Sequence, residues 1–310
     1  MIGWQPTSEM ISSSILTGLS LGPAKCALII QPYDSGDLQR EFPSILLDIE
    51  QGTVQSNAVL PFVARSLVDT PDGLFVVGRL GQVTRIQSGQ RFNEEIVGPD
   101  HFGFLAEARL IGDSLYVVGI RRQVYVRDNA GRWSRADSGV LDQNRQFDRV
   151  SGFRSVDAVS SNEIFAVGRE GEIWRHSAGV WRQEPSVTNL ILEQVRAGGD
   201  GEVYIAGQMG TLIKGHHTVW SVLDQTETDS DFWGLEWFQG DLYLATRDTL
   251  LCLPKGRMPL RPVPVAEGTS FGGLSAGHGA LWSFGATEAH WTSDGARWHS
   301  IEVPRVEASD

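Results

Sequence analysis

Short apolar runs alternate with polar turns along most of the chain, and six of these runs match one another. They are GLFVVG ending at Gly78, SLYVVG at Gly119, EIFAVG at Gly168, EVYIAG at Gly207, DLYLAT at Thr246 and ALWSFG at Gly285. Their ends are 41, 49, 39, 39 and 39 residues apart. Each run is rich in β-branched and aromatic residues and ends at a small residue, which predicts a buried strand followed by a turn.

The positions around these runs keep the same register. A cluster of turn residues precedes each run, such as TPDG at 70–73 and GGDGE at 198–202. Five residues after the small residue, five units have an apolar position: Val83, Val124, Ile173, Leu212 and Leu251. Thirteen or fourteen residues after it, five units have an aromatic: Phe92, Trp133, Trp181, Trp220 and Trp298. The spacing predicts units of four antiparallel strands and about 40 residues, with the aromatic packed between neighbouring units.

A four-stranded unit cannot bury both of its faces alone, so we predict an all-β fold, a β-propeller of four-stranded antiparallel blades that forms one domain over residues 1–310. Six clear blades cover 62–304, and 305–310 is a C-terminal tail. Residues 1–61 contain two strand-like runs, CALII and SILLDIEQ, which favour a divergent first blade and seven blades in total. The alternative is a six-bladed ring with an N-terminal extension that serves as closure segment. We also expect one terminus to pair with the other, because closure removes exposed strand edges.

The repeat, roughly VxAxGDGEVYxxGxxGxIxRxxxGxW, resembles those of bacterial BNR-like and WD-like propellers and is similar in cadence to photosystem assembly-factor propellers. In the last repeat TSDGARW looks like a shortened Asp-box, S-x-D-x-G-x-x-W. The resemblance implies that Asp294 and Gly295 form a turn and that Trp298 packs beneath it. It concerns architecture, and one fold hosts many unrelated functions, so it implies no activity.

Charge narrows the class of partner. The 310 residues include 26 Lys and Arg against 38 Asp and Glu, a net charge of -12. Such a field repels phosphate backbones and attracts basic proteins, so we expect a basic protein partner and no nucleic acid. The chain has no apolar run long enough to span a membrane, and a signal peptide is not expected because no Lys or Arg precedes Lys25 and Glu9 precedes the weakly apolar stretch. We therefore expect a cytoplasmic protein with no membrane partner.

Motifs for catalysis and cofactor binding are missing from the sequence. The seven histidines and two cysteines have no metal-site spacing, and no nucleophile elbow, phosphate loop or dinucleotide fingerprint occurs in a suitable context. We expect no catalytic residues, no cofactor and no metal. An enzyme with a site in the central channel, a hydrolase or lyase, stays open as an alternative, as does an assembly or scaffold factor.

The long connections between blades are the candidate functional segments, because propellers place function on such loops. They share one face of the ring with the loops from each second to each third strand, and they combine aromatics, arginines and acids, as protein-binding surfaces do. The predicted partner-binding residues are Phe102, Arg121, Phe147, Arg169, Asp229, Asp231, Phe232, Trp233, Arg247 and Phe271. The alternative for each aromatic is that it turns inward and pins its loop. The leading hypothesis is a non-catalytic scaffold that binds a protein, in its specific form an immunity protein that inhibits a basic toxin.

Overall fold

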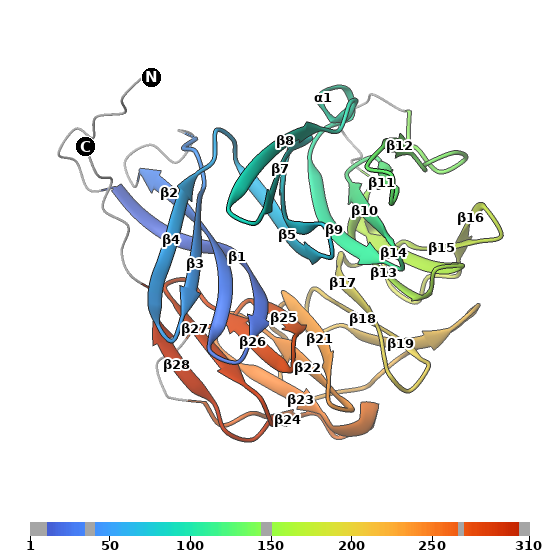
Figure 1. Ribbon diagram of the computed structural model, residues 1–310. Helices are drawn as coiled ribbons and strands as arrows, with labels where there is room; N and C mark the ends of the chain where they lie inside the picture. Colours follow the sequence, from blue (N-terminus) through green and yellow to red (C-terminus); the bar gives the residue numbers. More distant parts are fainter. Residues whose placement is uncertain (1–10, 35–40, 144–150, 266–269, 304–310) are drawn as a thin grey trace.

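The computed structural model describes residues 11–34, 41–143, 151–265 and 270–303, which form seven four-stranded antiparallel sheets arranged in a ring (Figure 1). Blades 1 to 3 consist of β1 (Ile11–Gly22), β2 (Lys25–Asp34), β3 (Ile45–Glu50) and β4 (Thr53–Val59); β5 (Ala64–Thr70), β6 (Gly73–Gly78), β7 (Gln82–Gln87) and β8 (Gln90–Glu95); and β9 (Leu105–Ile111), β10 (Ser114–Gly119), β11 (Val124–Arg127) and β12 (Trp133–Arg135).

Blades 4 to 7 follow in chain order. They consist of β13 (Phe153–Ser160), β14 (Glu163–Gly168), β15 (Ile173–Ser177) and β16 (Val180–Glu184); β17 (Leu192–Ala197), β18 (Val203–Gly207), β19 (Leu212–His216) and β20 (Val219–Val222); β21 (Gly234–Phe238), β22 (Asp241–Ala245), β23 (Leu250–Leu253) and β24 (Arg261–Pro262); and β25 (Gly273–Gly277), β26 (Ala280–Phe284), β27 (Glu288–Thr292) and β28 (His299–Glu302). Helix is confined, in these ranges, to α1 (Pro99–Phe102) and the 3-10 turns η1 (Arg169–Gly171) and η2 (Pro254–Gly256).

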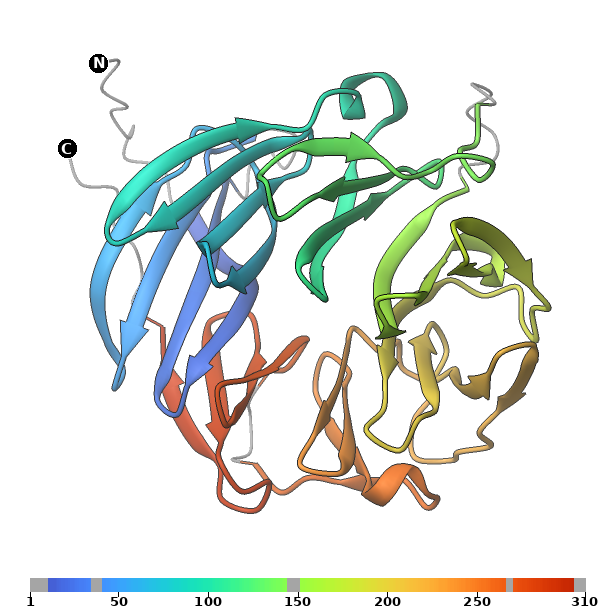
Figure 2. The same cartoon turned by 45° about the vertical axis from the view of Figure 1, so that its right-hand side comes forward.

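The predicted propeller is confirmed with seven blades, so the six-bladed alternative is wrong. The first strand of each blade is innermost, since β1, β5, β9, β13, β17, β21 and β25 contact one another in sequence around the ring (Figure 2). Polar side chains that meet across the ring therefore come from these seven strands.

Aromatics on the fourth strands fill the space between blades, as predicted. Trp181 is 6% exposed and donates its indole N–H to the carbonyl of Ala136 in the preceding blade at 2.8 Å. Trp220 packs edge-on against Phe165, with ring centroids 5.8 Å apart. Phe92 is the exception, because it is 38% exposed beneath the guanidinium of Arg85.

A repeated run ends at a small residue for a steric reason. The incoming innermost strand passes so close to it that a Cβ on Gly168 would overlap the carbonyl of Gly152. Gly207 meets the carbonyl of Ile191 in the same way. These glycines allow the backbone amides that follow them to bond the incoming strand, as Arg169 does to Gly152 at 3.1 Å.

The expectation that the termini pair in one sheet is wrong. In the described chain β1 pairs with β2 and β28 with β27, so every blade consists of four consecutive strands. Because residues 11–59 supply all four strands of blade 1, no strand has to be exchanged. Blades 1 and 7 instead meet through hydrogen bonds: the amide of Ser20 donates to Ser275 Oγ at 3.0 Å, and Trp282 Nε1 donates to the carbonyl of Gly22 at 2.9 Å.

Within the described ranges, no helix is both long enough and apolar enough to cross a membrane.

Candidate partner-binding face

One end of the ring carries both the connections between blades and the loops from each second to each third strand. We call this end the long-loop face. Its connections include 95–105, 135–153, 222–234 and 262–273, whereas most turns at the opposite end have only two residues between strands. Nine of the ten predicted partner-binding residues belong to this face by their place in the chain, and the tenth, Phe147, lies outside the described residues.

The acidic loop between blades 5 and 6 is organised by a glutamine. Gln225 donates through Nε2 to the carbonyls of Gly210 and Thr228, and its Oε1 accepts the amides of Glu227 and Thr228 at 2.9 and 3.2 Å. The side chains of Glu227 and Asp229 remain exposed, so they contribute negative charge to the surface. Asp231 has a structural bond, because its Oδ1 accepts the amide of Met209 at 2.9 Å.

Adjacent aromatics at the end of this loop have opposite orientations. Phe232 is completely buried between blades 5 and 6, and its amide donates to the carbonyl of Gly207 at 3.0 Å. Trp233 is 42% exposed, and its amide donates to the carbonyl of Ala245 at 2.9 Å. The prediction that Phe232 is exposed is therefore wrong, because its ring anchors the loop while the next residue faces solvent.

Met209 lies beside this loop and was not predicted as a contact residue. It is 65% exposed on the turn after β18, and its amide bond to Asp231 ties that turn to the loop that bears Trp233. Met209 and Trp233 are thus two exposed apolar side chains on segments joined by this bond, and they are together called the Met209–Trp233 patch. A sequence signal existed: Met209 is two residues after the small residue Gly207, in a turn where blades 3 and 4 have Arg121 and Glu170.

Arg247 and Phe271 form a similar arrangement between blades 6 and 7. The ring of Phe271 is 8% exposed and belongs to the core of these blades, so its predicted exposure is wrong. Its amide donates to the carbonyl of Arg247 at 2.8 Å. The side chain of Arg247 is exposed. The structure thus brings Asp231, Trp233 and Arg247 onto neighbouring loops, each held in place by a hydrogen bond to a backbone group.

The remaining predicted residues lie on the connection between blades 2 and 3 and on loops of blades 3 and 4, and they are half-buried. Phe102 ends α1, and the guanidinium of Arg135 covers its ring at 4.9 Å. The amide of Arg121 donates to the carbonyl of Ser151 at 2.8 Å. The Nε of Arg169 is buried and has no hydrogen-bond partner in the part of the chain that the structure describes.

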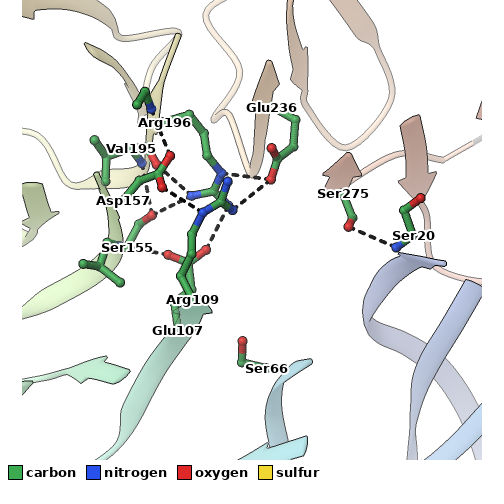
Figure 3. Close-up of polar contacts among 12 residues, drawn as sticks. Ser20, Ser66, Glu107, Arg109, Ser155, Asp157, Val195, Arg196, Glu236 and Ser275 are labelled. Carbon is green, nitrogen blue, oxygen red and sulfur yellow. Dashed lines mark hydrogen bonds and ion pairs between the residues drawn. The ribbon is translucent and has the colours of Figure 1, made fainter. Parts of the chain in front are cut away.

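Charged residues that the sequence analysis did not single out converge in the channel (Figure 3). Arg109 of blade 3 contacts Asp157 of blade 4 at 2.9 Å and Glu236 of blade 6 at 3.2 Å. Arg196 of blade 5 contacts Glu236 and Glu107, each at 2.9 Å. Burial lowers the pKa of Arg109, but the charges of Asp157, Glu236 and Glu107 outweigh this effect and raise it overall. Both arginines therefore stay charged and link four blades across the axis.

Backbone groups complete this channel network. Glu107 Oε2 accepts the amide of Val156 at 2.9 Å, and Asp157 Oδ2 accepts the amide of Ala197 at 2.9 Å. Ser155 Oγ accepts from Arg196 Nη1 at 3.1 Å. These groups bond to one another and to neighbouring strands, so the network connects the blades to one another.

The network has a sequence signal that only alignment of the repeat shows. Arg109, Asp157, Arg196 and Glu236 each lie ten or eleven residues before the small residue of their unit, on the innermost strand. Their charges alternate around the ring. Periodicity of apolar residues could not find them, because the pattern appears only when charged positions of successive units are compared.

The turn in the last repeat forms as the resemblance implied. Asp294 Oδ1 accepts the amides of Ala296 and Arg297 at 2.9 and 2.8 Å, and Gly295 has φ 72°. Trp298 packs edge-on against Tyr243 of blade 6, with centroids 6.3 Å apart. As for metals, the described residues contain no group of three or more His, Cys, Asp or Glu that could hold an ion.

These features define a seven-bladed β-propeller with anchored, partly apolar loops on one face. Among solved structures it is similar to virginiamycin B lyase from Staphylococcus aureus (TM-score 0.64, 9% identity, 79% of this chain and 86% of the other) and to YCF48 from Cyanidioschyzon merolae (TM-score 0.63, 14% identity, 96% and 97%). At these identities the likeness shows the fold alone. The propeller class inferred from the repeat is confirmed, whereas a specific BNR relationship is not shown.

No family model matches the chain. Among curated proteins, it is 32% identical over 255 residues to the immune protein Tsi7 of Pseudomonas aeruginosa strain PAO1, which covers 80% of this chain and 83% of Tsi7. The chain therefore belongs to the family of the immune protein Tsi7.

Proposed function

We propose that this protein is a non-catalytic cytoplasmic immunity protein that neutralises a basic toxin by binding it through the long-loop face. The observation that carries the proposal is the kinship with an immune protein together with a rigid scaffold whose loops display an exposed apolar patch. The net charge of -12 also supports the proposal, because it would accelerate the encounter with a basic protein.

The Met209–Trp233 patch is the proposed centre of the contact. Tryptophan supplies much binding energy at protein interfaces when surrounding residues exclude water. Trp233 is held by its backbone bond to Ala245 and by the buried Phe232, so little loop ordering is needed when the partner binds. Glu227, Asp229 and Arg247 would form the charged rim.

A protection experiment tests the proposed function. A candidate toxin is expressed in a sensitive host with and without this chain, and the complex is then measured with purified proteins. We expect growth to be restored only in the presence of this chain, and we expect the association rate to fall by on the order of tenfold between low and high salt. Unchanged toxicity, or an association rate that salt does not affect, would contradict the proposal.

A pair of variants locates the binding face. Trp233→Ala is expected to weaken the complex by about 2 kcal/mol or more, which is roughly thirtyfold, because it removes a large anchoring ring. Val219→Ala is the matched control, since Val219 is 74% exposed at the opposite end of the ring. Equal effects of the two variants would exclude the long-loop face as the binding surface.

A further inference from the structure

A cavity of about 200 Å³ lies between blades 2 and 3, at the end of the ring opposite the long-loop face. Its walls are the turns from β5 to β6, from β9 to β10 and from β11 to β12, together with the strand ends beside them. Every residue that lines it lies within the described ranges. The cavity is smaller than the pockets of about 300–1,000 Å³ that hold drug-sized ligands, so its size suits a group no larger than a side chain.

One side of the cavity is apolar and is lined by Phe75 of blade 2 and by Leu110 and Leu115 of blade 3. In the repeat, Phe75 corresponds to Tyr204, since each lies three residues before the small residue of its unit. Leu110 corresponds to Trp237, since each pairs with the residue four positions before that small residue. Between blades 5 and 6 the indole of Trp237 stacks on Tyr204, with ring centroids 5.7 Å apart. The equivalent place between blades 2 and 3 has only a leucine, which leaves room for a group from outside the chain.

The guanidinium of Arg127 lies in the wall of the cavity and is already paired. It donates to both carboxylate oxygens of Glu94, at 2.8 and 3.0 Å, and it contacts Asp72 at 3.4 Å. The side chain of Arg127 is 9% exposed, and its guanidinium lies over the ring of Phe75 at 4.9 Å. An entering anion would have to displace Glu94 or Asp72 from this arginine, so the cavity does not suit an anion.

Among the described residues, the carboxylates at the rim leave one negative charge without a partner. Asp128 pairs with Arg132 at 2.9 Å. Asp113 is exposed on the turn from β9 to β10 and makes no hydrogen bond or ion pair with any described residue. The lining contains three carboxylates and a single guanidinium. A cation that enters would therefore meet an unpaired carboxylate next to an apolar wall.

We propose that this cavity binds an alkyl guanidinium or alkylammonium group, whose chain packs against the apolar side and whose charge pairs with Asp113. Removing the methylenes of the chain from water favours binding, and the cation forms charge-assisted hydrogen bonds with the carboxylate. The cation belongs either to a free small molecule or to an arginine or lysine side chain of another protein. The site lies at the opposite end of the ring from the Met209–Trp233 patch, so it does not rest on the proposed function.

The free protein tests the site. It is titrated with n-butylguanidinium at constant ionic strength, and the amide resonances of Asp113 and Asn129 are followed. We expect saturable shifts, binding of methylguanidinium that is weaker by about tenfold or more because it has three fewer methylenes, and no binding of pentanoate, in which a carboxylate ends the same chain. Asp113→Asn should weaken the binding by about fivefold or more, whereas Asp224→Asn, which removes an exposed charge from the long-loop face, should have no effect. Shifts that never saturate, equal binding of pentanoate, or unchanged binding to Asp113→Asn would overturn the site.

A second variant, Leu110→Trp, tests the cavity by filling it. It gives blade 3 the residue that blade 6 has as Trp237, next to an aromatic ring in both cases, so we expect the variant to fold with a Tm close to that of the natural protein. The indole should occupy the cavity and weaken the binding of n-butylguanidinium by about tenfold or more. A variant that circular dichroism shows to be folded and that binds as tightly as the natural protein would overturn the site.

A capped peptide, Gly-Gly-Arg-Gly-Gly, separates the two sources of the cation. Binding as tight as that of n-butylguanidinium, and weakened by Asp113→Asn, supports a protein side chain, because the entrance then admits a polypeptide backbone. Binding of n-butylguanidinium without binding of the peptide supports a free small molecule. Asp113→Asn should leave a toxin complex at the long-loop face unchanged, so the proposed function and this site fail separately.

Discussion

Replacing Arg196 by methionine tests whether the channel network holds the ring together. The side chain of Arg196 is 6% exposed and makes ion pairs with Glu107 and Glu236, both at 2.9 Å. Its removal leaves Glu236 with only the 3.2 Å contact from Arg109 and leaves Glu107 without a guanidinium. Breaking a buried ion pair by removing one partner costs about 3–5 kcal/mol. We expect Arg196→Met to lower the free energy of unfolding by that amount.

Urea unfolding followed by the fluorescence of the 10 tryptophans measures this loss. With an m-value of roughly 3 kcal/mol/M, the midpoint should fall by about 1 M or more. Arg132→Met is the control, because the Arg132 side chain is 79% exposed in its pair with Asp128, and such surface pairs contribute about 1 kcal/mol or less. Adding Glu107→Gln to Arg196→Met should restore part of the loss. If Arg196→Met behaves like Arg132→Met, the channel network does not stabilise the ring.

Three further perturbations follow from the packing. Gly168→Ala should cost about 1–3 kcal/mol, because its Cβ would overlap the carbonyl of Gly152; calorimetry checks this, and an unchanged Tm would contradict it. Trp282→Phe should cost about 1–3 kcal/mol by removing the hydrogen bond to the carbonyl of Gly22 where blades 1 and 7 meet, and native hydrogen exchange should rise first in β1 and β26. Burial lowers the pKa of His290 despite the opposing charge of Glu288, so below about pH 6.5 the unfolded chain takes up a proton that the folded chain resists. The free energy of unfolding should therefore be constant above that pH and fall below it, and the fall should be smaller in His290→Asn. If the unfolding midpoints of the two proteins change with the same slope between pH 7.5 and 5.5, this explanation is wrong.

The architecture could be predicted from the sequence because its signals are local and repeated. The run that ends at Gly168 forms strand β14, and Gly168 itself is where this strand lies closest to the backbone that leads into β13. The position of one glycine in the sequence therefore indicates both the end of a strand and a close backbone contact. The same signals are weaker in blade 1, where β1 extends over 12 residues and no matching small residue marks the end of the second strand.

The candidate site was less predictable because burial within a loop depends on tertiary contacts. Phe232 and Trp233 are adjacent aromatics, and only the backbone bonds to Gly207 and Ala245 decide which one turns inward. Arg109 and Glu236 are 127 residues apart and meet only because the chain circles the axis. A pattern of neighbouring residues in the sequence cannot indicate a contact between residues so far apart in the chain.

Because each sheet uses four strands in unbroken succession, a nascent chain can complete every module as soon as its last strand has been synthesised. No early segment has to wait, half paired, for a late one. The final event is the meeting of the first and last modules along a single non-covalent seam, which makes that seam the place where the torus would open first under strain.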